Sequence, residues 1–463
     1  MDRPRVGLLP LYLAYYDECL PTLREELSGF PEAVAEALRQ EGLDVHVAPI
    51  CCVRQEVAAA VSRFESAPVD ALAALHLAYS PSLEAAEPLA STALPLLMLD
   101  TTPDASFGRD MDPNRLLYNH GIHGVQDLAS VLRRMGKPYW VVAGHLSEGA
   151  LARRARLVAQ GAMAARLFRG TRALRIGPTF AGMGDFAVAE EVLTSRLGIT
   201  VEEVGVEALA ECAEAVTEEE LRAEAKHDRR SYEVAVSEGV LDRSNRLGLG
   251  LRRYLERGGF GAFSLSFREF SASEGPLSTV PFLECSKAMA RGVGYAGEGD
   301  LLTASLVGAL QRAFGDTTFT EMFCPDWEGD SIFLSHMGEV NPEVAAQRPR
   351  LYEKEFPFTP AANPACLDCA PRPGPALLVN LSPGPNESFR LIWTPVEVLE
   401  DGTHPSIHEW VRAWIRPEVP VASFLESYSL LGGTHHCALM LGRPVEGVLA
   451  FARAAGLEAR RAG

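Results

Sequence analysis

Residues 5–50 decide the fold, because they hold the apolar run RVGLLPLY (5–12), the segment FPEAVAEALRQEG (30–42) and the run DVHVAPI (44–50). In the middle segment the apolar side chains recur at helical spacing, which predicts an amphipathic helix that ends at Gly42. The flanking runs are short and apolar, as is typical of buried strands. A strand, a helix and a second strand in this order predict a βαβ unit, and therefore a parallel sheet covered by helices.

The same alternation continues to about residue 170. We expect strands in ALAALHLAYS (71–80), LPLLMLD (94–100) and PYWVVAGH (138–145), and a helix in GVQDLASVLRRMG (124–136). A second series begins at residue 173 with ALRIGPTFAGMGDF and includes the strands ITVEEVG (199–205) and GAFSLSF (261–267). After about residue 317 strands dominate, up to a last helix in VEGVLAFARAAG (445–456).

The predicted fold class is α/β, with two doubly wound parallel-sheet domains followed by a β-rich C-terminal domain. The expected ranges are 1–170 for the N-terminal α/β domain, 171–317 for the central α/β domain and 318–463 for the β-rich domain. The proline-rich stretch 360–376 is predicted to be a linker. Its single pair of cysteines, Cys366 and Cys369, has no second pair or histidines nearby, which argues against a zinc ribbon.

The composition excludes several classes of partner. A formal charge of −18 argues against nucleic acid and against an anionic membrane surface. Nine cysteines, an odd number scattered mostly in apolar runs, favour reduced thiols and a cytoplasmic protein. The apolar start VGLLPLYLAYY (6–16) is split by Pro10 and followed by acidic residues, so we predict a strand there rather than a signal peptide. No run approaches the ~20 apolar residues of a membrane span.

Four segments place acidic or imidazole side chains in apolar or glycine-rich surroundings, where a bare charge is costly unless it is paired or ligated. They are GYAGEGDLLTAS with Glu298, TTFTEMF with Glu321, IFLSHMGEV with His336, and GGTHHCA with His435 and His436. Glu298 lies in a glycine turn before a helix that Asp300 can cap, although acids also favour helix starts on electrostatic grounds alone. Glu321 shares a strand face with Phe319 and Phe323, so it lies at a sheet edge or has a partner.

The histidines allow a structural and a functional interpretation. His336 falls in a predicted apolar strand, where a lone histidine is more often a hydrogen-bonded core residue than a ligand. Glu339 is expected to point away from His336, in solvent or in an ion pair. Strand geometry sends His435 and His436 to opposite faces, so we expect one of them to bind a given ion. Two carboxylates and two imidazoles suit Mn²⁺ or Co²⁺, with open positions for a substrate.

A fifth segment, YNHGIHGVQDL (118–128), carries His120 and His123 ahead of a predicted helix. It is interpreted structurally as a capped loop between a strand and a helix. The functional interpretation is a ligand-binding loop, because polar loops at strand ends are where α/β domains bind ligands.

Together these segments resemble the L-arabinose isomerase and L-fucose isomerase superfamily, and the arabinose enzymes more closely. The resemblance lies in AGEGDLLTAS, TTFTEMFCP, LSHMGEVNP, GGTHHCA and NHGIHGVQD. It implies that Glu298, Glu321, His336 and His436 hold a divalent ion, usually Mn²⁺ and otherwise an ion such as Co²⁺ or Mg²⁺. It also implies that His123 reaches into a neighbouring subunit's site, while His120 replaces a family glutamine. Trimers or hexamers are the implied assemblies.

The hypothesis is therefore a metal-dependent aldose–ketose isomerase that moves a proton between C1 and C2 of a monosaccharide through an enediolate. Glu298 and Glu321 would transfer the protons, and His120, His123 and His435 would bind the sugar. Departures from the family pattern at Leu301, Leu302 and Met322 leave the sugar open. Two alternatives remain: a non-catalytic sugar-binding or regulatory protein on the same fold, or an epimerase or isomerase of an unusual acidic or sulfonated sugar.

Overall fold

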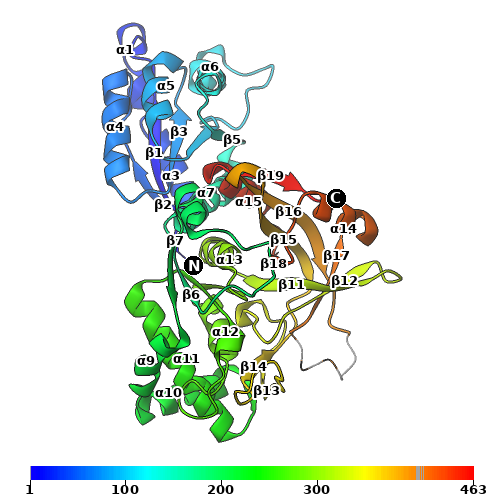
Figure 1. The fold of residues 1–463 in the computed structure, drawn as a ribbon. Coiled ribbons are helices and arrows are strands. Elements are labelled where there is room, and N and C mark those ends of the chain that lie inside the picture. The colour runs from blue at the N-terminus through cyan, green and yellow to red at the C-terminus, as the bar shows by residue number, and fades with distance from the viewer. Residues whose placement is uncertain (1, 403–406, 408, 410) are drawn as a thin grey trace. The chain divides into compact units, whose positions relative to one another are not determined.

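A computed structural model describes residues 2–402, 407, 409 and 411–463 (Figure 1). The chain forms two compact units. The first comprises residues 2–166 and 445–456, and the second comprises residues 167–444 and 457–463. The predicted fold class is confirmed, because both units contain a parallel sheet and the second unit also contains a β-rich part. Among the described residues, no helix is both long and apolar enough to cross a membrane.

The first unit is built on a five-stranded parallel sheet in the order β2-β1-β3-β4-β5. Its strands are β1 (Arg5–Leu11), β2 (Asp44–Val47), β3 (Ala71–His76), β4 (Leu96–Asp100) and β5 (Tyr139–Ala143). Its helices are α1 (Tyr16–Cys19), α2 (Leu23–Leu27), α3 (Phe30–Gln40), α4 (Arg54–Ser66), α5 (Ser82–Ser91), α6 (Gly121–Arg134), most of α7 (Ala150–Arg169), and α15 (Val445–Ala454). Along β1, Leu8 joins the core with α3 and α7, whereas Leu9 joins the core with α4, α5 and α6. This alternation places helices on both faces of the sheet.

Helix α15 comes from the end of the chain and completes the first unit. A side chain at Gly161 of α7 would come within 2.3 Å of the Gly447 backbone oxygen, so the absence of a side chain there lets the two helices pack closely. Arg154 of α7 also forms an ion pair with Glu446 of α15. The domain ranges expected from the sequence remain a prediction. They include residues 1, 403–406, 408 and 410, which lie outside the described residues.

The second unit contains a four-stranded parallel sheet in the order β10-β9-β6-β7. Its strands are β6 (Arg172–Ile176), β7 (Thr200–Val204), β9 (Ala262–Leu265) and β10 (Gly294–Gly297). The helices of this part are α8 (Glu190–Val192), α9 (Ala210–Glu214), α10 (Glu218–Ser231), α11 (Glu238–Gly258), α12 (Phe282–Ala290) and α13 (Leu301–Phe314).

A mostly antiparallel sheet forms the β-rich part of the second unit, in the order β15-β18-β11-β12-β17-β16-β19. Because β15 also pairs with β16, the strands from β15 to β16 close into a barrel. The strands are β11 (Thr317–Asp326), β12 (Ser331–Ser335), β15 (Gly374–Pro383), β16 (Phe389–Val398), β17 (Ala413–Pro417), β18 (His436–Leu441) and β19 (Glu458–Arg461), and α14 (Val421–Leu430) follows β17. Leu334, Leu378 and Ile415 belong to the apolar core of this barrel.

Helix α13 connects the two sheets of the second unit. Nearly all of its side chains are buried, including Leu301, Leu302 and Leu306. It contacts β9 and β10 of the parallel sheet as well as β11 and β18 of the barrel (Figure 1). A helix that is apolar on all sides needs such cover, which explains the composition LLTASLVGALQRAF. The start of α13 is therefore held where both sheets meet.

The linker prediction for residues 360–376 is wrong. Residues Ala365–Asp368 form strand β14, which pairs with β13 (Arg350–Glu353), and β13 pairs in turn with β8 (Glu233–Ala235). Cys366 and Cys369 are both buried free thiols. The prolines flank the short buried strand β14. Because the linker prediction used the average composition of the whole stretch, it missed the four residues of this strand.

Candidate metal centre

Glu298 lies between β10 and α13 in a backbone conformation that glycine usually adopts. Its φ is +65°, in the left-handed region, which costs roughly 1–2 kcal/mol for a residue with a side chain. Backbone hydrogen bonds hold it there: its amide donates to the Leu265 carbonyl at 3.1 Å, and the Phe180 amide donates to its carbonyl at 2.9 Å. The carboxylate is buried. Strain held in this way aims one side chain, which is typical of functional sites.

Strand register brings Glu321 next to the histidines. In the barrel, Glu321 of β11 pairs with His436 of β18 on one side and with Ser335 of β12 on the other. Glu321 is therefore in a strand with neighbours on both sides, which excludes the sheet-edge alternative. A bulge at Met322 to Cys324 interrupts the alternation, so Phe319 is buried whereas Phe323 is 37% exposed.

His336 lies just beyond β12, and its ring is oriented by Glu339. The expectation that Glu339 points away is wrong, because β12 ends at Ser335 and the chain bends, so strand alternation no longer applies. The Nδ1 atom of His336 lies 2.8 Å from a carboxylate oxygen of Glu339. Glu339 is fully buried, and it also accepts hydrogen bonds from the Tyr295 hydroxyl at 2.6 Å and the Gly338 amide at 2.8 Å.

His436 is the first residue of β18 and is fully buried. Its Nδ1 lies 3.0 Å from one oxygen of Asp300, while the other oxygen of Asp300 accepts the Thr303 amide at 2.9 Å. The second contact confirms the predicted N-cap of α13. The ring of Phe186 stacks on His436 with a centroid distance of 5.0 Å.

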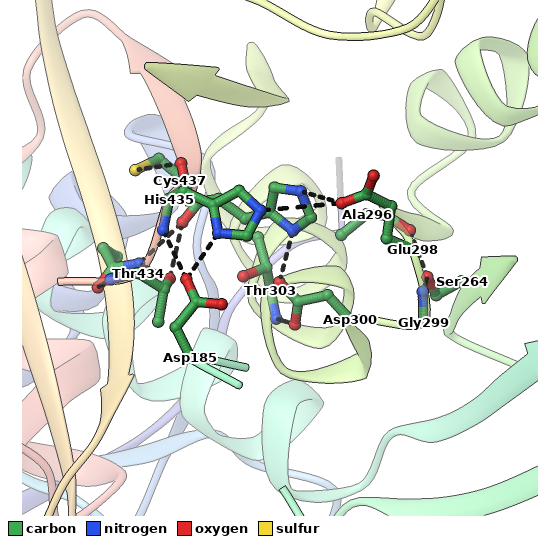
Figure 2. A network of polar contacts seen from close by, with 12 residues as sticks. Asp185, Ser264, Ala296, Glu298, Gly299, Asp300, Thr303, Thr434, His435 and Cys437 are labelled. Carbon is green, nitrogen blue, oxygen red and sulfur yellow. Dashed lines mark hydrogen bonds and ion pairs between the residues drawn. The ribbon is translucent and has the colours of Figure 1, made fainter. Parts of the chain in front are cut away.

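His435 contacts Asp185, as Figure 2 shows, whereas its neighbour His436 contacts Asp300. Its backbone amide and its Nδ1 contact the same oxygen of Asp185, at 3.0 and 2.6 Å. Its Nε2 lies 3.8 Å from a carboxylate oxygen of Glu298. Burial opposes the charged form of His435, but the carboxylates of Glu298 and Asp185, which accept hydrogen bonds from its ring, outweigh burial and raise the pKa of His435 to about 9.

The four residues proposed as ligands converge in the second unit, and His436 links them. Ligand atoms of Glu321, His336 and His436 lie within 4.8 Å of one another, and so do those of Glu298, His435 and His436. The Nε2 of His436 is 3.6 Å from an oxygen of Glu298. Bonds of about 2.0–2.2 Å to one ion would place two ligand atoms about 3 to 4.4 Å apart, and the 3.6 Å between His436 and Glu298 falls in this range.

Two buried nitrogen atoms test whether a divalent ion fits this site. Within the described part of the chain, the Nε2 atoms of His336 and His436 are buried and have no hydrogen-bond partner. In both rings the carboxylate contact favours the proton on Nδ1, so that the neutral ring would offer its Nε2 lone pair to an ion. Buried polar atoms without partners are rare in proteins, and here they lie beside two carboxylates. A divalent ion fits this donor set.

His120 and His123 belong to the first unit. His123 lies in the first turn of α6, where its Nδ1 is 3.0 Å from Nε2 of His120 and its ring stacks on Tyr79 at 4.4 Å. The Tyr79 hydroxyl donates to Asp127, which also accepts the Ser82 amide at the start of α5. Asp127, in the second turn of α6, thus joins α5 and α6.

Three contacts of the candidate site were missed from the sequence: those of Asp185, Tyr295 and Glu339. Asp185 follows β6 in the glycine-rich segment AGMGDF, and the general rule that ligands bind at the ends of parallel strands would have marked it. Tyr295 carries no such signal, because an aromatic residue in a buried strand is usually core.

Comparison with known proteins identifies the family. Residues 179–314 match the model of the L-arabinose isomerase central domain, and residues 316–458 match that of the L-arabinose isomerase C-terminal domain. An L-arabinose isomerase from a Nocardioides species is 31% identical over 385 residues, covering 79% of this chain and 74% of that protein. The enzyme from Acidothermus cellulolyticus is 27% identical, covering 92% of this chain and 88% of that protein. The enzyme from Yersinia enterocolitica is 26% identical, covering 94% and 90%.

These matches place the chain among the aldose–ketose isomerases, a class of intramolecular oxidoreductases. The chain belongs to the L-arabinose isomerase family, which confirms the resemblance of its motifs.

Proposed function

We propose that the chain interconverts an aldose and its ketose by moving a proton between C1 and C2, at a divalent ion held by Glu298, Glu321, His336 and His436. The observation that carries the proposal is a pair of buried imidazoles beside two carboxylates, whose Nε2 atoms have no hydrogen-bond partner among the residues that the structure describes. Mn²⁺ is the ion we expect, with Co²⁺ or Mg²⁺ as alternatives, because a mixed set of oxygen and imidazole donors suits such ions.

The bound ion would act as a Lewis acid toward the two sugar oxygens that gain negative charge as the C–H proton leaves, a contribution of several kcal/mol. The proton transfers themselves need a base and an acid near C1 and C2. Glu298 and Glu321 supply two carboxylates, each close to His436. Burial raises the pKa of Glu298, but hydrogen bonding to His435 and the nearby histidines outweigh it and leave the pKa below the ordinary value, so this group is an ionised base.

We assign sugar binding to His435, His120 and His123. Asp185 holds His435 beside Glu298, which leaves the Nε2 edge of the ring facing the carboxylate where a hydroxyl could be shared. The relatives carry the name L-arabinose isomerase, so L-arabinose is the first sugar to test. We further propose a homo-oligomer, a trimer or hexamer, in which His120 and His123 serve a neighbouring subunit's site. Light scattering of the purified protein tests the assembly.

The experiment removes bound metal with a chelator and measures ketose formation by NMR, with and without added Mn²⁺. The panel contains aldopentoses, 6-deoxyhexoses and acidic sugars, so that epimerisation at C2 or an unusual substrate is also detected. Glu298→Gln and Glu321→Gln are expected to abolish turnover, whereas Glu426→Gln, on the exposed face of α14, should not change it. Full turnover without any metal would refute the proposal.

A further inference from the structure

We propose that Glu339 and Asp300 are positioning residues that set the direction of the two ligating imidazoles, and that Tyr295 extends this role by holding Glu339. The inference rests on the proposed function, because it concerns the same ion. None of the three residues touches the ion or the sugar in this proposal.

Glu339 is built to hold one ring in one orientation. Its carboxylate is fully buried and receives three contacts: Nδ1 of His336 at 2.8 Å, the Gly338 amide at 2.8 Å and the Tyr295 hydroxyl at 2.6 Å. The amide and hydroxyl contacts involve groups that only donate here, so they fix the carboxylate and leave it to accept the proton of Nδ1. The His336 tautomer with a bare Nε2 is therefore favoured.

Asp300 performs the same task for the second ring from a different element. One carboxylate oxygen caps α13 by accepting the Thr303 amide, and the other faces Nδ1 of His436 at 3.0 Å. Both Asp300 and His436 are fully buried, so water does not compete for this contact. Because the cap is part of the helix start, the direction of His436 is tied to the same turn that aims Glu298.

The two orphaned Nε2 atoms show what this arrangement is for. Each ring has one nitrogen bonded to a buried carboxylate and the other nitrogen buried without a partner among the described residues. A packed core would satisfy both nitrogens, since an unmet buried group destabilises the fold. Orientation of both lone pairs before binding lowers the cost of assembling the ion's ligands.

The test measures Mn²⁺ affinity by titration calorimetry on chelated protein, and the histidine tautomers by ¹⁵N NMR. Asp300→Asn keeps a capping oxygen but presents an amide N–H to His436, and Glu339→Gln presents one to His336. Each is expected to lower Mn²⁺ affinity by about 10- to 100-fold, the usual effect of losing an outer partner of a metal ligand. Each should also move the proton of the affected ring from Nδ1 to Nε2.

Tyr295→Phe removes one of the three contacts of Glu339 and should give a smaller loss of affinity, which keeps the test valid if Glu339→Gln fails to fold. The matched control is Ser286→Ala, because Ser286 accepts the Val340 amide and so supports the same segment without touching an imidazole. If the wild type binds Mn²⁺, the inference would be overturned by Asp300→Asn and Tyr295→Phe variants that keep the wild-type Mn²⁺ affinity and the wild-type histidine tautomers. A wild type that binds no Mn²⁺ would instead overturn the proposed function, and the inference with it.

Discussion

Replacing Gly297 with alanine is expected to push His336 out of its ligating position. A side-chain carbon at Gly297 would lie 2.6 Å from Cε1 and 2.9 Å from Nε2 of His336. Ordinary contact begins at 3.4 Å, so the ring must retreat by about 0.8 Å, the difference between these values, unless β10 moves. Distances in working metal sites hold to within about 0.2 Å. The added methyl group therefore displaces the ligand by several times the tolerated error.

The expected result is at least a tenfold loss of Mn²⁺ affinity and a matching loss of isomerase activity at limiting Mn²⁺, measured by calorimetry and by ketose formation. Gly297 does not adopt a left-handed backbone, so alanine is compatible with its φ and the effect reports on the contact alone. Gly261→Ala is the matched control, because a side chain there meets only Thr171 at 3.8 Å. Unchanged affinity in Gly297→Ala would refute the close packing of His336 on β10.

Two further predictions concern stability in the second unit. Burial raises the pKa of Glu224, but Arg252 and Lys287 outweigh it and lower the pKa from 4.5 to about 2. Because the pKa of Glu224 is lower in the folded state, its ion pairs stabilise the fold above about pH 5, and this stabilisation is lost as the pH falls toward 2. We expect it to be about 2 kcal/mol of unfolding free energy. In urea unfolding, the stability of Glu224→Gln should therefore depend less on pH than that of the wild type. In the barrel, Ile415→Ala is expected to cost about 2–5 kcal/mol of unfolding free energy, whereas Leu430→Ala, at a side chain that is 88% exposed, should stay within about 0.5 kcal/mol. Equal effects of the last two changes would contradict the assigned core.

Local sequence patterns predicted most of the fold. The spacing of α3 was predictable because this helix buries one periodic face. Strand β1 was predictable as a short, continuous apolar run because both of its faces are buried. Strand β14 could not be predicted from the sequence, because four buried residues between prolines are too few to show a hydrophobic period. At the site, the residue types of Glu298 and His436 suggested a metal because both lie in surroundings where charge needs a partner.

The partners within the site depend on tertiary structure. Glu339 follows His336 by three residues, and its role changes completely once β12 ends one residue before the histidine. Asp185 and His435 are 250 positions apart in the chain, and no local pattern connects them. The sequence alone therefore pointed to candidate ligands that lie close together in the structure, and it missed the contacts of the residues beside them.

Helix α15 has a consequence for biosynthesis. The five strands of the first unit are translated within the first 143 residues, yet the helix packed against Gly161 is not made until residues 445–454. During synthesis, about three hundred residues are therefore added after the last strand of this sheet before the helix that covers one of its apolar flanks is made. Chaperone contact during synthesis should concentrate on that flank, and a stop codon ahead of α15 should leave an aggregating product even though every strand of that sheet has been made.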